Sequence, residues 1–300
     1  ARIATAGTFM GRATVYDADD NPHTIHLHSK PFYDADGRRD GLVASFRIID
    51  EEVAAEERAQ SEIARRDRQN QSLTRLLQAQ TDRLMSDMDS AAKYVASILP
   101  GDLDGRVTVS SRYVSSRELG GDSYDYRWID DDPLLVYLLD VSGHGVEPAM
   151  VSVSVHNLLR SGTLPSETLR EPDQVLAELN RLFQMDRQAG NYFTIWYGVY
   201  RSSTRTLRYA SAGHPPAIVL KPGSGAENAT TLSTDAMPIS VFEDTEFTAQ
   251  TYEVPADAEM LVYSDGAFEL SLPDGRPWLL SDFVELCTEL ATSPEWSLDD

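Results

Sequence analysis

The segment LLVYLLDVSGHG, residues 134–145, places a carboxylate directly after a run of large apolar side chains. Five of the six residues before Asp140 are aliphatic and the sixth is Tyr137, which predicts a strand buried on both faces. A charge at the end of such a strand costs free energy unless something pairs with it. The arrangement recurs in MLVYSDG, residues 260–266, where Asp265 follows a second apolar run. These two aspartates are therefore the first candidates for a functional site.

A third acid occurs in RELGGDSYD, residues 117–125, where Gly120 and Gly121 allow a sharp turn before Asp122. Carboxylates brought together by neighbouring strands repel one another, so that one of them stays protonated. A divalent cation removes that conflict, because carboxylate and carbonyl oxygens suit Mg²⁺ and Mn²⁺. Two such ions could activate water and clamp a phosphoryl group. For each acid taken alone, an Asx turn at a strand end is the commoner explanation, and spacing by itself leaves both interpretations open.

Four motifs occur in the order GGDSYD (120–125), DVSGHG (140–145), AGHPP (212–216) and YSDG (263–266). Together they resemble the metal-dependent serine/threonine phosphatases of the type 2C (PPM) superfamily. The nearest branch is the bacterial stage II sporulation protein E group, with the phosphatases that govern alternative sigma factors. The resemblance covers about residues 98–290 and implies an α+β fold, an αββα sandwich with a binuclear Mn²⁺ or Mg²⁺ centre between its sheets.

The resemblance also implies roles for individual residues. Asp140 is expected to bridge both ions, and the carbonyl of Val141 is expected to join it on one of them. Asp122 would serve that same ion, directly or through water, and Asp265 would bind the other. Water activated at this centre would attack the phosphorus of a phosphoserine or phosphothreonine in line. No covalent intermediate is needed, which fits a single cysteine, Cys287, in an ordinary apolar helical pattern.

Two features depart from the family pattern. Relatives usually have a final Asp-Asp pair near a C-terminal strand, whereas Asp299 and Asp300 stand in a context that does not match, so the second metal site is expected to be incomplete in this sequence. Pro238-Ile239-Ser240 stands where relatives often have Pro-Leu/Ile-Gly. The chain begins at Ala1 without Met and ends in an acidic segment, which suggests a fragment of a longer protein.

Three histidines and one arginine lie near the motifs. For His144 in the DVSGHG turn, hydrogen bonds that shape the loop are favoured over a general acid role. His214 is expected to hold the turn that leads into two prolines, and His156 to lie on the surface or in the core of a helix. Arg117 is expected in a surface ion pair, with a phosphate contact as the alternative.

The first 50 residues are expected to be rich in β-strands, with turns at Asp19–Pro22 and at Asp36-Gly37. The segment FYDADGRRDGLVASFRIIDEEVAAEERA, residues 32–59, resembles the last strands of a PAS sensor domain running into its exit helix. A PAS-like domain is therefore predicted over residues 1–50. The histidines of this region, His23, His26 and His28, are expected to line the polar face of a strand, and a metal site is the alternative.

Residues 51–99 are expected to form one long helical linker, because neither Gly nor Pro occurs between Asp50 and Leu99. A heptad pattern begins at Thr74, with Thr74, Thr81, Met88 and Val95 at position a and Leu77, Leu84, Ala91 and Ile98 at position d. This pattern predicts a homodimeric parallel coiled coil through residues 74–98. The alternative is a single helix that packs on its own domain.

Composition limits the classes of function. The net charge of −22, from 48 acidic and 26 basic residues, argues against a nucleic-acid surface and against an anionic membrane face. A lone cysteine excludes an internal disulfide and a cysteine-based zinc site. No apolar stretch approaches the roughly 20 residues that span a bilayer, and no signal peptide is visible. The chain is therefore expected to act in the cytoplasm, without inserting into a membrane.

Residues 100–300 are thus interpreted as a phosphatase domain that a PAS-like sensor regulates through the helical linker. The expected substrate is a phosphorylated anti-sigma-factor antagonist with a STAS fold. A linker acts as a switch only if it has two packings that bias the site, and Leu84, Met88, Ala91, Val95 and Ile98 are the candidate positions. The second hypothesis is a catalytically inactive scaffold with the same fold. A nucleotide-binding kinase lacks support, because no Gly-rich phosphate loop with a following Lys occurs.

Overall fold

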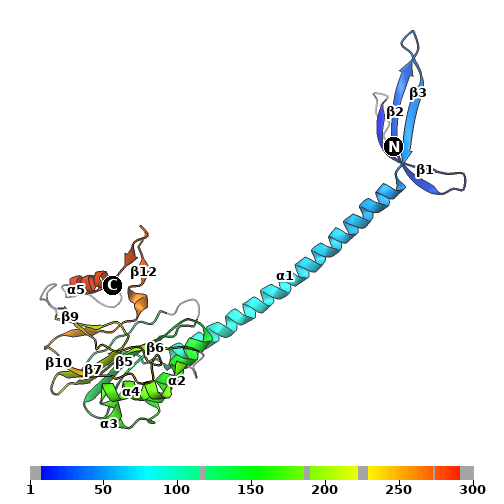
Figure 1. Cartoon of the computed structure of the whole chain (residues 1–300). Coiled ribbons are helices and arrows are strands. Elements are labelled where there is room, and N and C mark those ends of the chain that lie inside the picture. Colours follow the sequence, from blue (N-terminus) through cyan, green and yellow to red (C-terminus); the bar gives the residue numbers. More distant parts are fainter. Residues whose placement is uncertain (1–7, 115–118, 186–189, 222–228, 273, 291–300) are drawn as a thin grey trace. The chain divides into compact units, whose positions relative to one another are not determined.

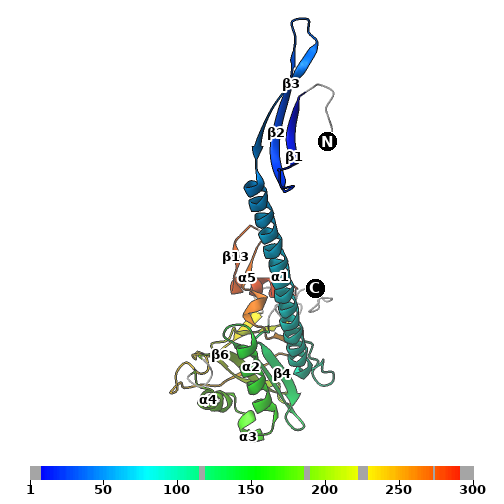
Figure 2. The same ribbon diagram turned by 90° about the vertical axis from the view of Figure 1, so that its right-hand side faces the viewer.

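The computed structural model describes residues 8–114, 119–185, 190–221, 229–272 and 274–290. The chain divides into two compact units, residues 1–84 and 85–300, and the helix α1 (Asp50–Ile98) contributes to both (Figures 1 and 2). None of the helices in the described ranges has both the length and the apolar character that crossing a membrane requires.

The first unit holds an antiparallel sheet of three strands in the order β1-β2-β3. Their bounds are β1 (Phe9–Tyr16), β2 (Pro22–Tyr33) and β3 (Arg39–Ile48). The register aligns Ile25 with Ala13 and Ile48, and these side chains share one face because successive residues of a strand point to opposite sides. The β-rich segment predicted from the sequence is present, and its PAS-like character stays a prediction.

The three histidines of β2 do not lie together. His26 and His28 share one face of the sheet, whereas His23 points to the other face, so the expectation of a common polar face is wrong for His23. Nδ1 of His23 lies 2.7 Å from the carboxylate of Asp50, the first residue of α1, and Nε2 lies 3.3 Å from Asp17. These contacts, with Asp50 foremost, raise the pKa of His23. His23 therefore fastens the sheet to the start of the helix.

Helix α1 begins with three acidic residues, which favour the positive end of the helix dipole, and ends before Pro100. Its last turns belong to the second unit, where Val95 is buried against Leu119 and Ala149. Upstream, the seam residues Leu77 and Leu84 are exposed. The alternative of a helix packed on its own domain therefore holds for the last turns of α1.

Two antiparallel sheets form the centre of the second unit. The larger sheet has the strand order β10-β7-β6-β5-β4, with bounds β4 (Ser123–Trp128), β5 (Pro133–Val141), β6 (Phe193–Arg201), β7 (Thr206–Ala212) and β10 (Gln250–Glu253). The smaller sheet has the order β11-β8-β9, with bounds β8 (Ala217–Leu220), β9 (Ala229–Leu232) and β11 (Glu259–Leu261).

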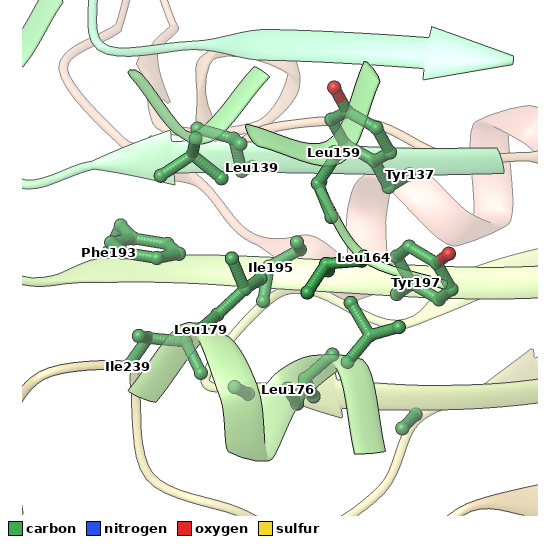
Figure 3. Packing of buried hydrophobic residues seen from close by; sticks show 14 of the residues in the cluster. Tyr137, Leu139, Leu159, Leu164, Leu176, Leu179, Phe193, Ile195, Tyr197 and Ile239 are labelled. Atoms are coloured by element: carbon green, nitrogen blue, oxygen red, sulfur yellow. The ribbon is translucent and has the colours of Figure 1, made fainter. Parts of the chain in front are cut away.

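Helices cover the outer faces of both sheets, and Figure 1 shows α2, α3 and α4 on one side and α5 on the other. Their bounds are α2 (Val146–Arg160), α3 (Ser166–Leu169), α4 (Pro172–Leu182) and α5 (Leu280–Leu290). Tyr137, Leu139 and Ile195 of the larger sheet pack against Leu159, Leu176 and Leu179 of the helices (Figure 3).

Two further apolar clusters complete the layers. Between the sheets, Trp196 and Leu207 pack against Val219 and Leu232. On the far side of the smaller sheet, Ile218 and Leu220 pack against α5, including the buried Cys287 that the sequence places in a core. The order helix, sheet, sheet, helix confirms the predicted αββα sandwich.

Two predicted strands differ from the structure. Residues 107–114 form only an isolated bridge between Val109 and Leu103, and the Ser111 hydroxyl bonds instead to Tyr126 OH at 3.0 Å. The run before Asp265 is a strand only as far as Leu261, so this aspartate does not close a strand. It begins the 3₁₀ turn η3 (Asp265–Ala267), which precedes a short pair of strands, β12 (Leu270–Ser271) and β13 (Pro277–Trp278).

Candidate metal and active centre

The three aspartates predicted from the motifs meet at one end of the larger sheet. Strands β4 and β5 pair with Ser123 opposite Leu139, and continuing this register by one residue sets Asp122 opposite Asp140. Asp140 also lies opposite Thr194 of β6. The segment before Asp265 joins them, because Ser264 Oγ donates a hydrogen bond of 3.0 Å to Oδ2 of Asp122. Asp122 and Asp140 thus lie in contact, and Asp265 lies near enough for its charge to act on both of them.

Gly121 permits this approach. A Cβ atom at position 121 would lie 2.5 Å from the carbonyl oxygen of Val141, closer than any side chain tolerates. Only glycine therefore lets the chain before Asp122 pass so near to β5. The close approach leaves the Val141 carbonyl, which the resemblance assigns to a metal, beside the turn that carries Asp122.

Burial and mutual repulsion hold protons on this cluster. Burial, followed by the charges of Asp122 and Asp265, raises the pKa of Asp140 to about 8. Burial also raises the pKa of Asp122, although the hydrogen bonds from Ser264 and from the Asp140 carboxyl oppose that rise. The Asp122 and Asp140 carboxyls bond to each other, and this bond adds to the causes that favour a proton on Asp140 in the metal-free chain.

A fourth acid, Glu269, was not predicted from the sequence. Its charge adds to the causes that raise the pKa of Asp140. The η3 turn brings it back toward the cluster, since the amide of Glu269 donates to the carbonyl of Asp265 at 2.8 Å. The spacing of four residues in DGAFE was the available signal, but it lies outside the motif that ends at Gly266.

His214 is a structural residue, as predicted. It is buried, its Nδ1 lies 2.8 Å from Thr194 Oγ1, and burial lowers its pKa to about 4. His214 is therefore neutral at physiological pH. Its hydrogen bond holds Thr194, the residue of β6 that lies opposite Asp140. His144 is exposed in its turn. His156 was expected either on the surface of a helix or in the core. It lies on α2 and is buried in the core.

The residues present fit a divalent cation. Apart from the Asp140 carboxyl, the buried Oδ1 of Asp122 has no hydrogen-bond partner among the described residues. In the part of the chain that the structure describes, His, Cys, Asp and Glu side chains do not close into a ligand cage of three. The oxygen-only donor set, with a buried orphan oxygen, is the chemistry that Mg²⁺ and Mn²⁺ prefer.

Three positions named from the sequence lie outside the described residues: Arg117, Asp299 and Asp300. Ser240 stands where relatives often have glycine. Its φ is +82°, a backbone conformation that favours glycine. Its amide donates to Oδ1 of Asn180 at 2.8 Å, which holds the turn in place. The glycine that relatives often carry is thus explained by backbone geometry.

Comparison with known proteins gives three findings. The family model described as Stage II sporulation protein E (SpoIIE) matches residues 130–299. The phosphoserine phosphatase RsbP of Bacillus subtilis is 33% identical over 171 residues, which cover 56% of this chain and 41% of RsbP. RsbU of the same organism, also a phosphoserine phosphatase, is 26% identical over 163 residues, which cover 54% of this chain and 47% of RsbU. The chain therefore spans less than half the length of these curated relatives.

Among solved structures, the SiaA-PP2C domain of Pseudomonas aeruginosa superposes with a TM-score of 0.56 at 18% sequence identity. The match covers 71% of this chain and 85% of that domain. At this level of identity the likeness concerns the fold alone, and it agrees with the layers described above.

Proposed function

This chain belongs to the stage II sporulation protein E family, and from that membership we propose that it is a metal-dependent protein serine/threonine phosphatase. The observation that carries the proposal is the convergence of Asp122, Asp140 and Asp265, where burial and the neighbouring acids raise the pKa values of Asp122 and Asp140. Such a cluster has no structural benefit by itself, because buried acids that repel one another destabilise the fold.

We assign the ligands as the resemblance implies: Asp140 to both ions, Asp122 and the Val141 carbonyl to one, and Asp265 to the other. When bound, Mn²⁺ or Mg²⁺ would lower the pKa of a water molecule and neutralise charge on the phosphoryl oxygens. The chain itself orients Asp122 through the Ser264 hydroxyl. Because ligation requires ionised carboxylates, Asp122 and Asp140 would have to give up the proton between them to solvent before they could hold a cation.

The proposed substrate is a phosphoserine or phosphothreonine on a regulatory protein, an anti-sigma-factor antagonist with a STAS fold. The two Bacillus subtilis relatives, both named phosphoserine phosphatases, support the class of reaction. In this proposal residues 1–50 form a PAS-like sensor, residues 51–99 a linker that dimerises through 74–98, and residues 100–300 the cytoplasmic phosphatase domain. The continuous helix α1 between the sheet and the sandwich supports this organisation.

The test is Mn²⁺-dependent hydrolysis of p-nitrophenyl phosphate and of a phosphoserine protein. Asp140→Asn and Asp265→Asn are each expected to lower kcat/KM by about 100-fold or more, since each removes a ligand's charge. The control is Asp173→Asn, an acid of α4 whose carboxylate pairs with Arg208 at 3.1 Å, and it should leave the rate unchanged. Binding of Mn²⁺ without hydrolysis of either substrate would instead identify a catalytically inactive scaffold.

A further inference from the structure

A second buried acid, Asp125, lies three residues beyond Asp122 on strand β4 and is fully buried. Its carboxylate lies 3.5 Å from Nε of Arg160 and 3.7 Å from Nε of Arg127. Neither carboxylate oxygen accepts a hydrogen bond within the described residues. One buried charge is therefore set between two guanidinium groups, at ion-pair distance from both.

Each guanidinium also binds the C-terminal end of a helix. Arg160 Nη1 donates to the carbonyl of Ile98, the last residue of α1, at 3.2 Å. Arg127 Nη2 donates to the carbonyl of Leu159, at the end of α2, at 2.5 Å. The last carbonyls of a helix lack partners inside the helix and carry partial negative charge, so a cation suits both places. Asp125 thus orients two arginines that cap two helices.

His156 joins α2 to the start of β4. It is 1% exposed, and its Nδ1 lies 3.0 Å from Tyr137 OH and 3.3 Å from Ser123 Oγ. Ser123 is the first residue of β4 and directly follows Asp122. Two polar links, at Ser123 and at Asp125, therefore hold the first half of β4, the strand that begins directly after Asp122.

Stability alone does not account for this cluster. Removing two or three charges from water costs as much free energy as their attraction returns, and apolar side chains of similar volume often stabilise a core equally well. The carboxylate of Asp125 also lacks the hydrogen bonds that would offset its burial. What such groups supply is a fixed orientation, because each ion pair and hydrogen bond has one geometry.

We propose that Asp125, Arg160 and His156 are positioning residues for Asp122, and that they fix β4 to the last turn of α1. The inference rests on the proposed function, since Asp122 matters here as a metal ligand. It differs from that proposal in assigning a role to residues that touch neither metal nor substrate.

The first test is Arg160→Gln, which removes the charge between Asp125 and Ile98 from a side chain that is 42% exposed. The matched control is Arg208→Gln, because Arg208 is equally exposed at 42% and pairs with acids of the helical layer. Direct calorimetric titration with Mn²⁺ should show affinity about 10-fold weaker in Arg160→Gln, the scale of outer-shell effects, and unchanged in Arg208→Gln. The melting temperature of each metal-free variant reports its fold separately.

The second test uses His156. His156→Asn retains a polar group near the position of Nδ1, whereas His156→Leu retains only volume. Weaker Mn²⁺ binding in His156→Leu, with recovery in His156→Asn at a similar melting temperature, supports positioning. The inference is overturned if Arg160→Gln and His156→Leu lower the melting temperature but bind Mn²⁺ like the unaltered chain. If the unaltered chain neither binds Mn²⁺ nor hydrolyses phosphoserine, the proposed function fails and this inference falls with it.

Discussion

The surroundings of Asp140 disfavour the ionised form of its carboxyl group. Its pKa is raised to about 8, first by burial and then by Asp122 and Asp265. In the unfolded chain the same group would titrate near its ordinary value of about 4. Between these two pH values the folded protein therefore holds a proton that the unfolded chain has released, so raising the pH destabilises the metal-free fold.

The corresponding prediction concerns pH and stability in the presence of a chelator. From pH 5 to pH 8 the free energy of unfolding should fall by roughly 2–4 kcal/mol more in the unaltered chain than in Asp140→Asn, allowing for solvent screening of a half-buried group. Chemical denaturation at several pH values measures this difference. Equal pH dependence in the two proteins would show that Asp140 titrates normally and that the acids do not interact.

A second prediction at the residue scale concerns Gly121. Gly121→Ala would set a methyl group 2.5 Å from the Val141 carbonyl oxygen, so the backbone must shift. We expect a loss of stability of about 1–3 kcal/mol, together with weaker Mn²⁺ binding. Gly101→Ala is the matched control, because a Cβ there meets nothing within 4 Å. Urea unfolding and Mn²⁺ titration measure both effects, and a Gly121→Ala variant that behaves like Gly101→Ala contradicts the proposed close approach.

The candidate aspartates could be predicted from the sequence, but the residues that surround them could not. Asp122, Asp140 and Asp265 stand inside motifs with flanking glycines, so the sequence marks them as candidates. Glu269 lies outside the motifs and reaches the cluster because the η3 turn folds back, and the four-residue spacing in DGAFE is too weak a signal to predict that turn. The pairing of Asp125 with Arg160 depends on contacts between β4 and α2, which are distant in sequence.

At the scale of elements, α1 has two environments along one heptad pattern. Val95 is buried within its own unit, whereas Leu77 and Leu84 have exposed side chains at 55% and 64%. Two exposed leucines at successive d positions of a long helix are unfavourable in water, and pairing with a second α1 would cover them. The coiled coil predicted from residues 74–98 therefore remains a proposal for the part upstream of the last turns.

Substitutions at two adjacent leucines test whether α1 forms this coiled coil. Leu77→Glu places a charge in the proposed seam and should convert dimer to monomer in sedimentation experiments. Leu76→Glu is the matched control, because Leu76 is similarly exposed at 59% but lies at position c of the heptad, outside the seam. A dimer that resists Leu77→Glu, or a chain that is monomeric without substitution, would show that α1 does not dimerise through this seam.

Elements with strong periodicity were predicted well. The helix α1, the helix α2 and the buried strand β5 follow from composition and spacing. The strand expected at residues 107–114 is absent, although its alternation of apolar and polar residues is clear, because β4 is the last strand of its sheet and does not pair with it. Alternation shows that a segment suits a sheet edge, but a strand also needs a partner, and the sequence does not say which edges are covered.

At the scale of the whole molecule, the residues that stabilise the sandwich differ from the candidate residues for its chemistry. Three apolar clusters hold the four layers together, and the carboxyl groups lie at an end of the larger sheet, away from the helix-facing core that Figure 3 shows. The layers were predictable from the order of the elements and from the motifs. The register that sets Asp122 opposite Asp140 was not, because shifting a strand by one residue exchanges its two faces without changing its composition.

The central claim, that acids from separate segments jointly bind divalent cations, is tested most directly by locating those cations. An anomalous-scattering map from a Mn²⁺-soaked crystal is expected to show manganese in contact with Asp122, Asp140 and Asp265, at the roughly 2.0–2.2 Å typical of oxygen ligands to small divalent ions. Manganese bound only elsewhere, or the three carboxylates free of metal at saturating Mn²⁺, would contradict the account.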